Sequence, residues 1–263
     1  FEENYSSVSF DTFFNSLNLF LVKSYTNSTK VKFHIDIDGD ADIKFFFKKK
    51  GKSVELEAEK LSDGDFYIDI SKLENCGILY PIITWDLNKP KINDFYYETN
   101  CESKPISTCV LITTFNRQEF LLPNLEKLLK VENLSHVVVV DNGNNLVLPK
   151  HLINEKITVI KNKNLGGSGG FTRGLMEAYK NKYSHVFIMD DDITLIPEVI
   201  EKTISLVSSL KDDCKDYWVG YSMLPNDKPT IQYELGTYWN GYRMDINRHN
   251  INLLKEKSFE KNQ

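Results

Sequence analysis

Three consecutive aspartates, Asp190, Asp191 and Asp192, follow the apolar run 186–189. If that run is a strand, alternate side chains share a face, so Asp190 and Asp192 can converge on one cation while Asp191 points away. Two carboxylates together with diphosphate oxygens suit Mg²⁺ or Mn²⁺. The alternative is an acidic turn in which Asp192 caps the helix expected near Pro197. The triplet therefore predicts a metal-diphosphate site if its neighbours also fit one.

Polar residues also follow the other apolar runs that we expect to be strands. These polar segments are Thr113-Thr114-Phe115-Asn116-Arg117, Asp141-Asn142-Gly143 and Asn162-Lys163-Asn164. The carboxyl ends of parallel strands lie along one edge of a sheet, which is where such folds bind ligands. We therefore expect these segments and the aspartates to gather at one site.

Three of these side chains suit parts of a nucleotide. A carboxylate at Asp141 can accept the imide N–H of uracil. The Thr113 hydroxyl suits a ribose or a base edge, and the Arg117 guanidinium suits a phosphate. The alternative for Arg117 is an ion pair with Glu119 or Glu126 on its own helix.

The segment Asn164-Leu165-Gly166-Gly167-Ser168-Gly169-Gly170 contains four glycines. We expect a loop whose backbone comes close to a ligand, ending at the N-terminus of a helix from about Gly170 to Lys182, where anions are favoured. The segment matches neither a Walker loop nor a Rossmann fingerprint. A flexible turn is the alternative interpretation.

The second half of the chain alternates between two hydrophobic patterns. Continuous apolar runs occur at 109–114, 137–140, 157–160 and 186–189, and a helical stripe is formed by Leu121, Leu125, Leu128 and Leu129. Buried strands alternating with helices predict an α/β fold with a mainly parallel sheet covered on both faces.

The sequence pattern of the first half predicts short strands. From Lys30 to about Trp85 apolar and polar residues alternate, as in 31–37 and 66–70, with turn signals at 38–40, 50–52 and 63–64. This pattern predicts a small antiparallel all-β sandwich or barrel. The polar segment 100–105 contains a proline, so we place the domain boundary there, giving domains 1–104 and 105–263.

The composition excludes some functions. The 263 residues are 41% hydrophobic and 26% charged, with a net charge of −5, which gives no support to nucleic-acid binding. No apolar run reaches the roughly 18 residues of a membrane span, and we expect no signal peptide because the sequence contains no segment with that pattern. We expect a cytoplasmic protein, with contact at the inner face of the membrane and homo-oligomerisation left open. The widely spaced Cys76, Cys101, Cys109 and Cys214 are expected to be reduced and structural.

These residues resemble the inverting glycosyltransferases of family 2 with the GT-A fold, and within them the galactofuranosyltransferases that build bacterial galactan and capsule polymers. The resemblance rests on segments 113–117, 141–143, 164–174 and 185–192, and extends to 11–15 and 219–224. It implies a GT-A nucleotide-sugar-binding domain preceded by a β-sandwich that could bind carbohydrate. It also implies transfer of galactofuranose, with inversion, from UDP-galactofuranose to a glycan or lipid-linked acceptor.

The resemblance implies roles for particular residues. Asp190 and Asp192 would hold Mn²⁺ or Mg²⁺. The implied nucleotide-sugar-binding residues are Thr113, Phe115, Arg117, Asp141, Asn164, Gly166, Gly167, Gly169, Gly170 and Asp191. Two other interpretations stay open: a rhamnosyl or other hexosyl transferase that uses a different nucleotide sugar, and a glycan- or nucleotide-binding protein without catalysis.

The catalytic base is the part of the pattern that we do not find. The family takes its catalytic acid pair, which includes the base, and a metal-ligating histidine from a C-terminal stretch that has no counterpart before Gln263. We therefore expect a chain truncated at its C-terminus that transfers sugar poorly, because general-base help is worth about 10²- to 10⁴-fold. Glu234, Asp245 and His249 are the candidates for a base within the sequence.

Overall fold

The computed structural model describes residues 6–214 and 216–255. The chain divides into two compact units. One runs from Glu102 to Ser209, and the other combines the residues up to Cys101 with those from Leu210 onward. The domain limits expected from the sequence, 1–104 and 105–263, remain a prediction.

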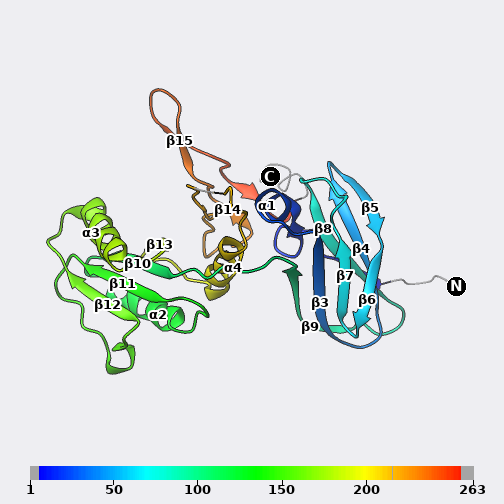
Figure 1. The fold of residues 1–263 in the computed structure, drawn as a ribbon, viewed down its shortest axis with the longest axis horizontal. Coiled ribbons are helices and arrows are strands. Elements are labelled where there is room, and N and C mark those ends of the chain that lie inside the picture. The colour runs from blue at the N-terminus through cyan, green and yellow to red at the C-terminus, as the bar shows by residue number, and fades with distance from the viewer. Residues whose placement is uncertain (1–5, 215, 256–263) are drawn as a thin grey trace. The chain divides into compact units, whose positions relative to one another are not determined.

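The unit Glu102–Ser209 is built on a parallel sheet (Figure 1). Its elements are β10 (Thr108–Thr114), α2 (Gln118–Leu128), β11 (His136–Asp141), the 3₁₀ helix η1 (Lys150–Leu152), β12 (Ile157–Lys161), α3 (Gly166–Lys180), β13 (His185–Asp190) and α4 (Pro197–Ser208). The strand order is β12-β11-β10-β13, and every neighbouring pair is parallel. The predicted α/β alternation is confirmed.

Both faces of this sheet are covered, because successive residues of β10 point to opposite sides. Val110 and Ile112 belong to a cluster with the leucines of α2 and with Ile200 and Ile204 of α4. Leu111 belongs to a second cluster, against which Phe171 of α3 packs. Figure 1 shows α2 and α3 on opposite sides of the sheet. The strand sequences are continuously apolar because neither face of the sheet is exposed to water.

The glycine-rich segment forms a helix earlier than the sequence predicted. α3 begins at Gly166, so most of the expected loop is the first turn of the helix. An added Cβ would lie 2.3 Å from Thr113 Cγ2 at Gly170 and 1.9 Å from Leu111 Cδ1 at Gly174. These two glycines let α3 approach β10 closely. Tertiary packing thus overrides the low helix propensity of glycine, about 1 kcal/mol per residue relative to alanine.

The other unit consists mainly of antiparallel strands. Its elements are β1 (Ser6–Ser9), β2 (Leu17–Asn18), α1 (Leu19–Tyr25), β3 (Lys30–Asp38), β4 (Asp42–Lys49), β5 (Lys52–Leu56), β6 (Ala58–Ser62), β7 (Asp65–Asp69), β8 (Ile78–Trp85), β9 (Lys91–Thr99), β14 (Ile231–Gln232), β15 (Thr237–Trp239), β16 (Met244–Ile246) and β17 (Ile251–Asn252). Gly39, Gly51 and Gly64 have positive φ angles, as the predicted turns require.

Two antiparallel sheets form the larger part of this unit. One has the order β1-β8-β4-β5 with β2 beside β8, and the other has the order β6-β7-β3-β9. Phe33 and Ile35 from one sheet share a buried cluster with Phe45 and Ile83 from the other. The residues from Leu210 onward join the unit through α1, where Lys211 Nζ donates to the carbonyl oxygen of Ser24 at 3.0 Å.

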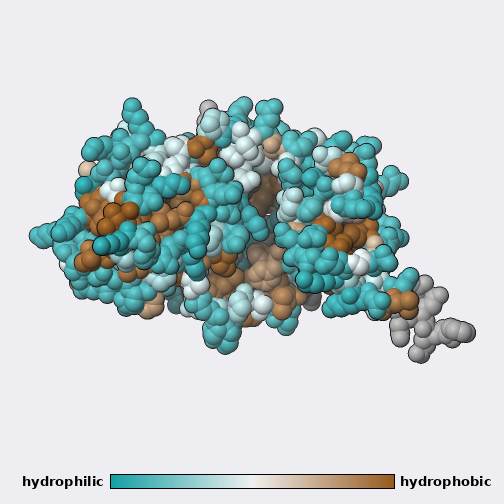
Figure 2. Space-filling model, turned by 90° about the horizontal axis from the view of Figure 1, so that it is seen from below, coloured by the Kyte–Doolittle hydropathy of each residue, from teal (hydrophilic) through white to brown (hydrophobic). Residues whose placement is uncertain are grey.

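The face in Figure 2 is predominantly hydrophilic, with hydrophobic residues in separate patches. Within the described residues, none of the helices combines the length and the apolar character that crossing a bilayer requires. The four cysteines are free, and burial raises the pKa of the Cys109 thiol to about 11, which keeps it protonated at neutral pH.

The packing of α3 predicts opposite effects for two glycines. Gly174→Ala should lower the free energy of unfolding by about 1–2 kcal/mol, because overpacking against Leu111 outweighs the gain in helix propensity. Gly167→Ala is the matched control, since no atom lies within 4 Å of its added Cβ, and it should be neutral or slightly stabilising. Urea denaturation followed by circular dichroism measures both, and equal stability of the two variants would contradict the packing role.

Candidate functional site

The register of the parallel sheet brings the predicted site residues to one edge. Thr114 pairs with Asp141 across β10 and β11, and Thr113 pairs with Asp190 across β10 and β13. The chain leaves β10 toward β11 and β12 and returns on the other side with β13. Such a reversal of strand order opens a crevice at the carboxyl ends of the strands. The predicted gathering at the strand ends is confirmed for these positions.

The aspartates alternate in exposure as the sequence suggested. Asp190 and Asp192 are exposed, whereas Asp191 is only 6% exposed. The Thr114 hydroxyl donates to Asp191 Oδ2 at 2.6 Å. The alternative in which Asp192 caps the following helix is wrong, because α4 begins at Pro197 after Ile196 and has no side-chain cap bond.

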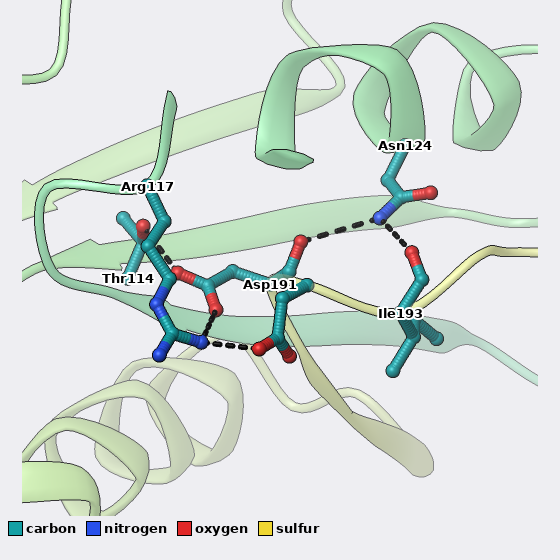
Figure 3. Close-up of polar contacts among 6 residues, drawn as sticks. Thr114, Arg117, Asn124, Asp191 and Ile193 are labelled. Carbon is teal, nitrogen blue, oxygen red and sulfur yellow. Dashed lines mark hydrogen bonds and ion pairs between the residues drawn. The ribbon is translucent and has the colours of Figure 1, made fainter. Parts of the chain in front are cut away.

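Arg117 lies against the aspartates (Figure 3). Its Nη1 is 3.7 Å from Asp191 Oδ1, and the same nitrogen donates to Asp192 Oδ2. The alternative pairing along its own helix is not what the described residues show, since Glu126 instead contacts His151 at 2.9 Å. The guanidinium is half exposed, so it borders both the carboxylates and the solvent.

Asn124 is a site residue that the sequence analysis missed. It is 3% exposed on α2. Its Nδ2 donates to the carbonyl oxygen of Ile193 at 2.8 Å and to that of Asp191 at 3.3 Å, and its Oδ1 accepts from the Leu195 N–H at 3.3 Å. These bonds hold the backbone of residues 191–195, the aspartate loop (Figure 3). An amide at helical spacing from Leu121 and Leu128, on the apolar face, was the signal available in the sequence.

Asp141 ends β11 and is 1% exposed. Its Oδ1 accepts the N–H of Gly143 and its Oδ2 that of Leu146, both at 2.9 Å. The carboxylate therefore shapes the loop that follows the strand. An ionised carboxylate has about four lone-pair positions, so two remain for another donor. Its contact with uracil stays a prediction.

Thr113 Oγ1 is a buried polar atom without a hydrogen-bond partner among the described residues. It faces Gly170 and lies near Asn142, whose Nδ2 donates to the Gly166 carbonyl oxygen at 3.3 Å. A buried hydroxyl left unpaired costs about 1–3 kcal/mol. An unpaired buried group of this kind requires a further partner such as water, an ion or a ligand.

The remaining predicted ligand-binding residues border solvent. Phe115 is 50% exposed, and Asn164 uses its Oδ1 to accept the Gly166 N–H at 3.0 Å. Gly166 and Gly167 are exposed in the first turn of α3, with no atoms within 4 Å of an added Cβ. This helix N-terminus presents backbone N–H groups and the positive end of a helix dipole.

The donor set at the strand ends suits a hard divalent cation, but it is incomplete by itself. The Asp190 carboxylate is exposed and has no hydrogen-bond or ion-pair partner among the described residues, whereas the Asp192 carboxylate forms an ion pair with Arg117. Among residues 6–214 and 216–255, no group of three or more His, Cys, Asp or Glu side chains is arranged to hold a metal. Carboxylate oxygens with room for further oxygen ligands fit Mg²⁺ or Mn²⁺ better than Zn²⁺.

The three candidates for a catalytic base lie in the other compact unit. Asp245 accepts from Arg243 Nε at 2.7 Å and from Asn240 Nδ2 at 2.6 Å. His249 is exposed, with its Nδ1 2.6 Å from the Tyr233 carbonyl oxygen. The backbone of Glu234 bridges to Met223. Their relation to the aspartate loop stays untested.

A parallel α/β unit with polar residues at its switch point is typical of nucleotide-binding proteins. The family model described as Glycosyl transferase family 2 matches residues 109–256, which is more than half of the sequence. The chain belongs to this family.

Two curated relatives are galactofuranosyltransferases named GlfT2. The chain is 25% identical over 251 residues to the one from Mycolicibacterium smegmatis and 24% identical to the one from Mycobacterium tuberculosis. Each match covers 88% of this chain but only 38% and 39% of the relatives. The chain thus spans about two fifths of their length.

Among solved structures, the chain is similar to a Glycosylation Associate Protein (Gap123) complex from Streptococcus agalactiae. The match has 14% identity, a TM-score of 0.23, and covers 79% of this chain and 84% of that chain. This likeness is too low to support an argument about fold.

The bonds of Asn124 predict a local loss of stability. Asn124→Ala should cost about 1–3 kcal/mol, because two carbonyl groups and one N–H of the aspartate loop lose their partner. The control Asn181→Ala removes an exposed amide that bonds within its own helix and should change stability by less than about 0.5 kcal/mol. Hydrogen exchange at the Leu195 amide should accelerate in Asn124→Ala alone; unchanged protection there would refute the role.

Proposed function

We propose that the protein transfers galactofuranose from UDP-galactofuranose to a glycan or lipid-linked acceptor, with inversion and with a divalent cation. The observation that carries the proposal is the common edge at which β10, β11 and β13 end, with Thr113, Asp141 and Asp190 in neighbouring register positions of a family 2 chain.

The nucleotide part is supported by three features of this edge. The unpaired Thr113 hydroxyl would bond to the ribose or base, and Asp141 keeps two acceptor positions for an imide N–H. The exposed N-terminus of α3 would favour the diphosphate. Phe115 and Asn164 would border the bound nucleotide sugar from the loops after β10 and β12.

The cation would be held by Asp190 and Asp192, and when bound it would stabilise the negative charge on the departing diphosphate. Asp191 would act indirectly, because its buried carboxylate fixes the loop that carries the other two. The donor sugar rests on the names of the two relatives and not on a contact in the site. Inverting transfer also requires a base that deprotonates the acceptor hydroxyl.

The cation site predicts metal-dependent nucleotide binding. UDP should bind in the presence of Mn²⁺ or Mg²⁺ and weakly in EDTA. The double variant Asp190→Asn/Asp192→Asn should lose at least about tenfold in UDP affinity with Mn²⁺, since losing even an outer-shell partner of a metal costs about 10- to 100-fold. Isothermal titration calorimetry measures this loss.

The control variant is Glu155→Gln/Glu198→Gln, which removes two exposed carboxylates from the same unit. It should bind UDP as the parent does. If the aspartate variant kept metal-dependent UDP binding, the assignment of Asp190 and Asp192 would be wrong.

A panel of ligands tests the preference for the nucleobase and for the donor sugar. UDP should bind more tightly than ADP or GDP, because the carboxylate of Asp141 accepts an imide N–H, and thymidine nucleotides, which share that edge, should compete with UDP. Within the sugar panel, UDP-galactofuranose should bind more tightly than UDP-galactopyranose and dTDP-rhamnose. Equal affinity for ADP and UDP would overturn the role of Asp141. Tighter binding of dTDP-rhamnose than of UDP-galactofuranose would show that the proposed donor sugar is wrong.

A further inference from the structure

One guanidinium pairs with the carboxylates of the aspartate loop in this structure. Arg117 Nη1 contacts the carboxylates of both Asp191 and Asp192 (Figure 3). Asp191 has a second partner in the Thr114 hydroxyl, whereas no described residue other than Arg117 contacts the Asp192 carboxylate. The charge balance at Asp192 therefore depends on Arg117.

The contact is of a kind that a ligand can replace. The side chains of Arg117 and Asp192 are 51% and 43% exposed, and ion pairs between half-exposed groups contribute little to stability. A divalent cation at Asp192 would repel the guanidinium and take the oxygen to which it now donates. An arginine released next to a diphosphate gains charge-assisted hydrogen bonds with geometry that suits phosphate oxygens.

We infer that Arg117 is an exchange residue: it neutralises Asp192 before ligands bind, yields Asp192 to the cation, and then binds the diphosphate. The inference rests on the proposed cation and diphosphate site and adds the order in which the two ligands bind there. Arg117 thus opposes binding of the cation alone and supports binding of the nucleotide. Removing Arg117 should therefore strengthen binding of the cation alone and weaken binding of the nucleotide. Local unfolding of a variant would instead weaken both kinds of binding.

The experiment compares the parent with Arg117→Gln and two controls. Arg117→Lys keeps the charge, and Arg173→Gln removes the same charge from α3, where Arg173 pairs with Glu177 on its own helix at 3.4 Å. Electron paramagnetic resonance of free Mn²⁺ gives the affinity for Mn²⁺ without nucleotide. Calorimetry at saturating Mn²⁺ gives the affinity for UDP, and circular dichroism checks that each variant is folded.

Arg117→Gln should bind Mn²⁺ alone about two- to fivefold more tightly than the parent, because a competing exposed ion pair is gone. The same variant should bind UDP with Mn²⁺ about 10- to 100-fold more weakly, because a charge-assisted bond to phosphate is lost. Arg117→Lys should stay near the parent for Mn²⁺ alone, and Arg173→Gln should match the parent in both measurements.

Weaker or unchanged binding of Mn²⁺ alone by Arg117→Gln would overturn the exchange. If the parent still bound UDP in a metal-dependent manner that required Asp190 and Asp192, the proposed function would survive that result. If the parent bound neither Mn²⁺ nor UDP, the exchange and the proposed function would both be wrong.

Discussion

The burial of the Asp191 carboxylate constrains the whole strand-end region. An ionised side chain this far from water is costly unless it is paired and hydrogen-bonded, and here the Thr114 hydroxyl and the Arg117 guanidinium supply the partners. β13 ends at Asp190, and Asp191 and Asp192 begin the turn that follows it, in which Asp191 is held inward while its two neighbours are exposed. The exposed pair, Asp190 and Asp192, therefore flanks the buried residue that anchors the turn.

The second support of the aspartate loop comes from α2. Asn124 occupies a position on the apolar face of the helix where a leucine would add hydrophobic burial, yet its amide satisfies three backbone groups of residues 191–195. Unpaired polar groups at such depth are disfavoured, so the loop depends on this side chain for its path. β10, α2 and the loop between them thus supply Thr114, Arg117 and Asn124, which all hold a segment 69 to 77 residues further along the chain.

Much of the parallel sheet could be predicted, and the reasons are local. Continuous apolar runs such as 137–140 have few uses other than a strand buried on both faces. The exposure of Asp190 and Asp192 agrees with the predicted alternation, although β13 ends at Asp190 and the other two aspartates lie in a turn. The predicted start of α3 was wrong because the low helix propensity of glycine indicated a loop. Close packing of Gly170 and Gly174 on β10 overrides that propensity. Asn124 was missed because its partners are fixed only by the tertiary fold. The backbone bonds of Asp141 are local, to the N–H groups two and five residues further on, and were missed because the path of that loop was not predicted. The strands from β14 to β17 have two or three residues each, too few for any period.

The charges at the strand ends explain why the proposed cation and nucleotide depend on each other. Three carboxylates and one guanidinium lie there, and the guanidinium pairs with two of the carboxylates, so an approaching diphosphate would meet net negative charge. A divalent cation would bring the formal charge of this group to zero and leave Arg117 and the N-terminus of α3 as attractive neighbours for phosphate. Conversely, two protein carboxylates fill only part of the six positions that Mg²⁺ prefers, and diphosphate oxygens and water can fill the rest. In the proposed function, the acidic edge would therefore make the cation a condition for nucleotide binding, and the shortage of protein ligands would make the nucleotide a condition for tight binding of the cation.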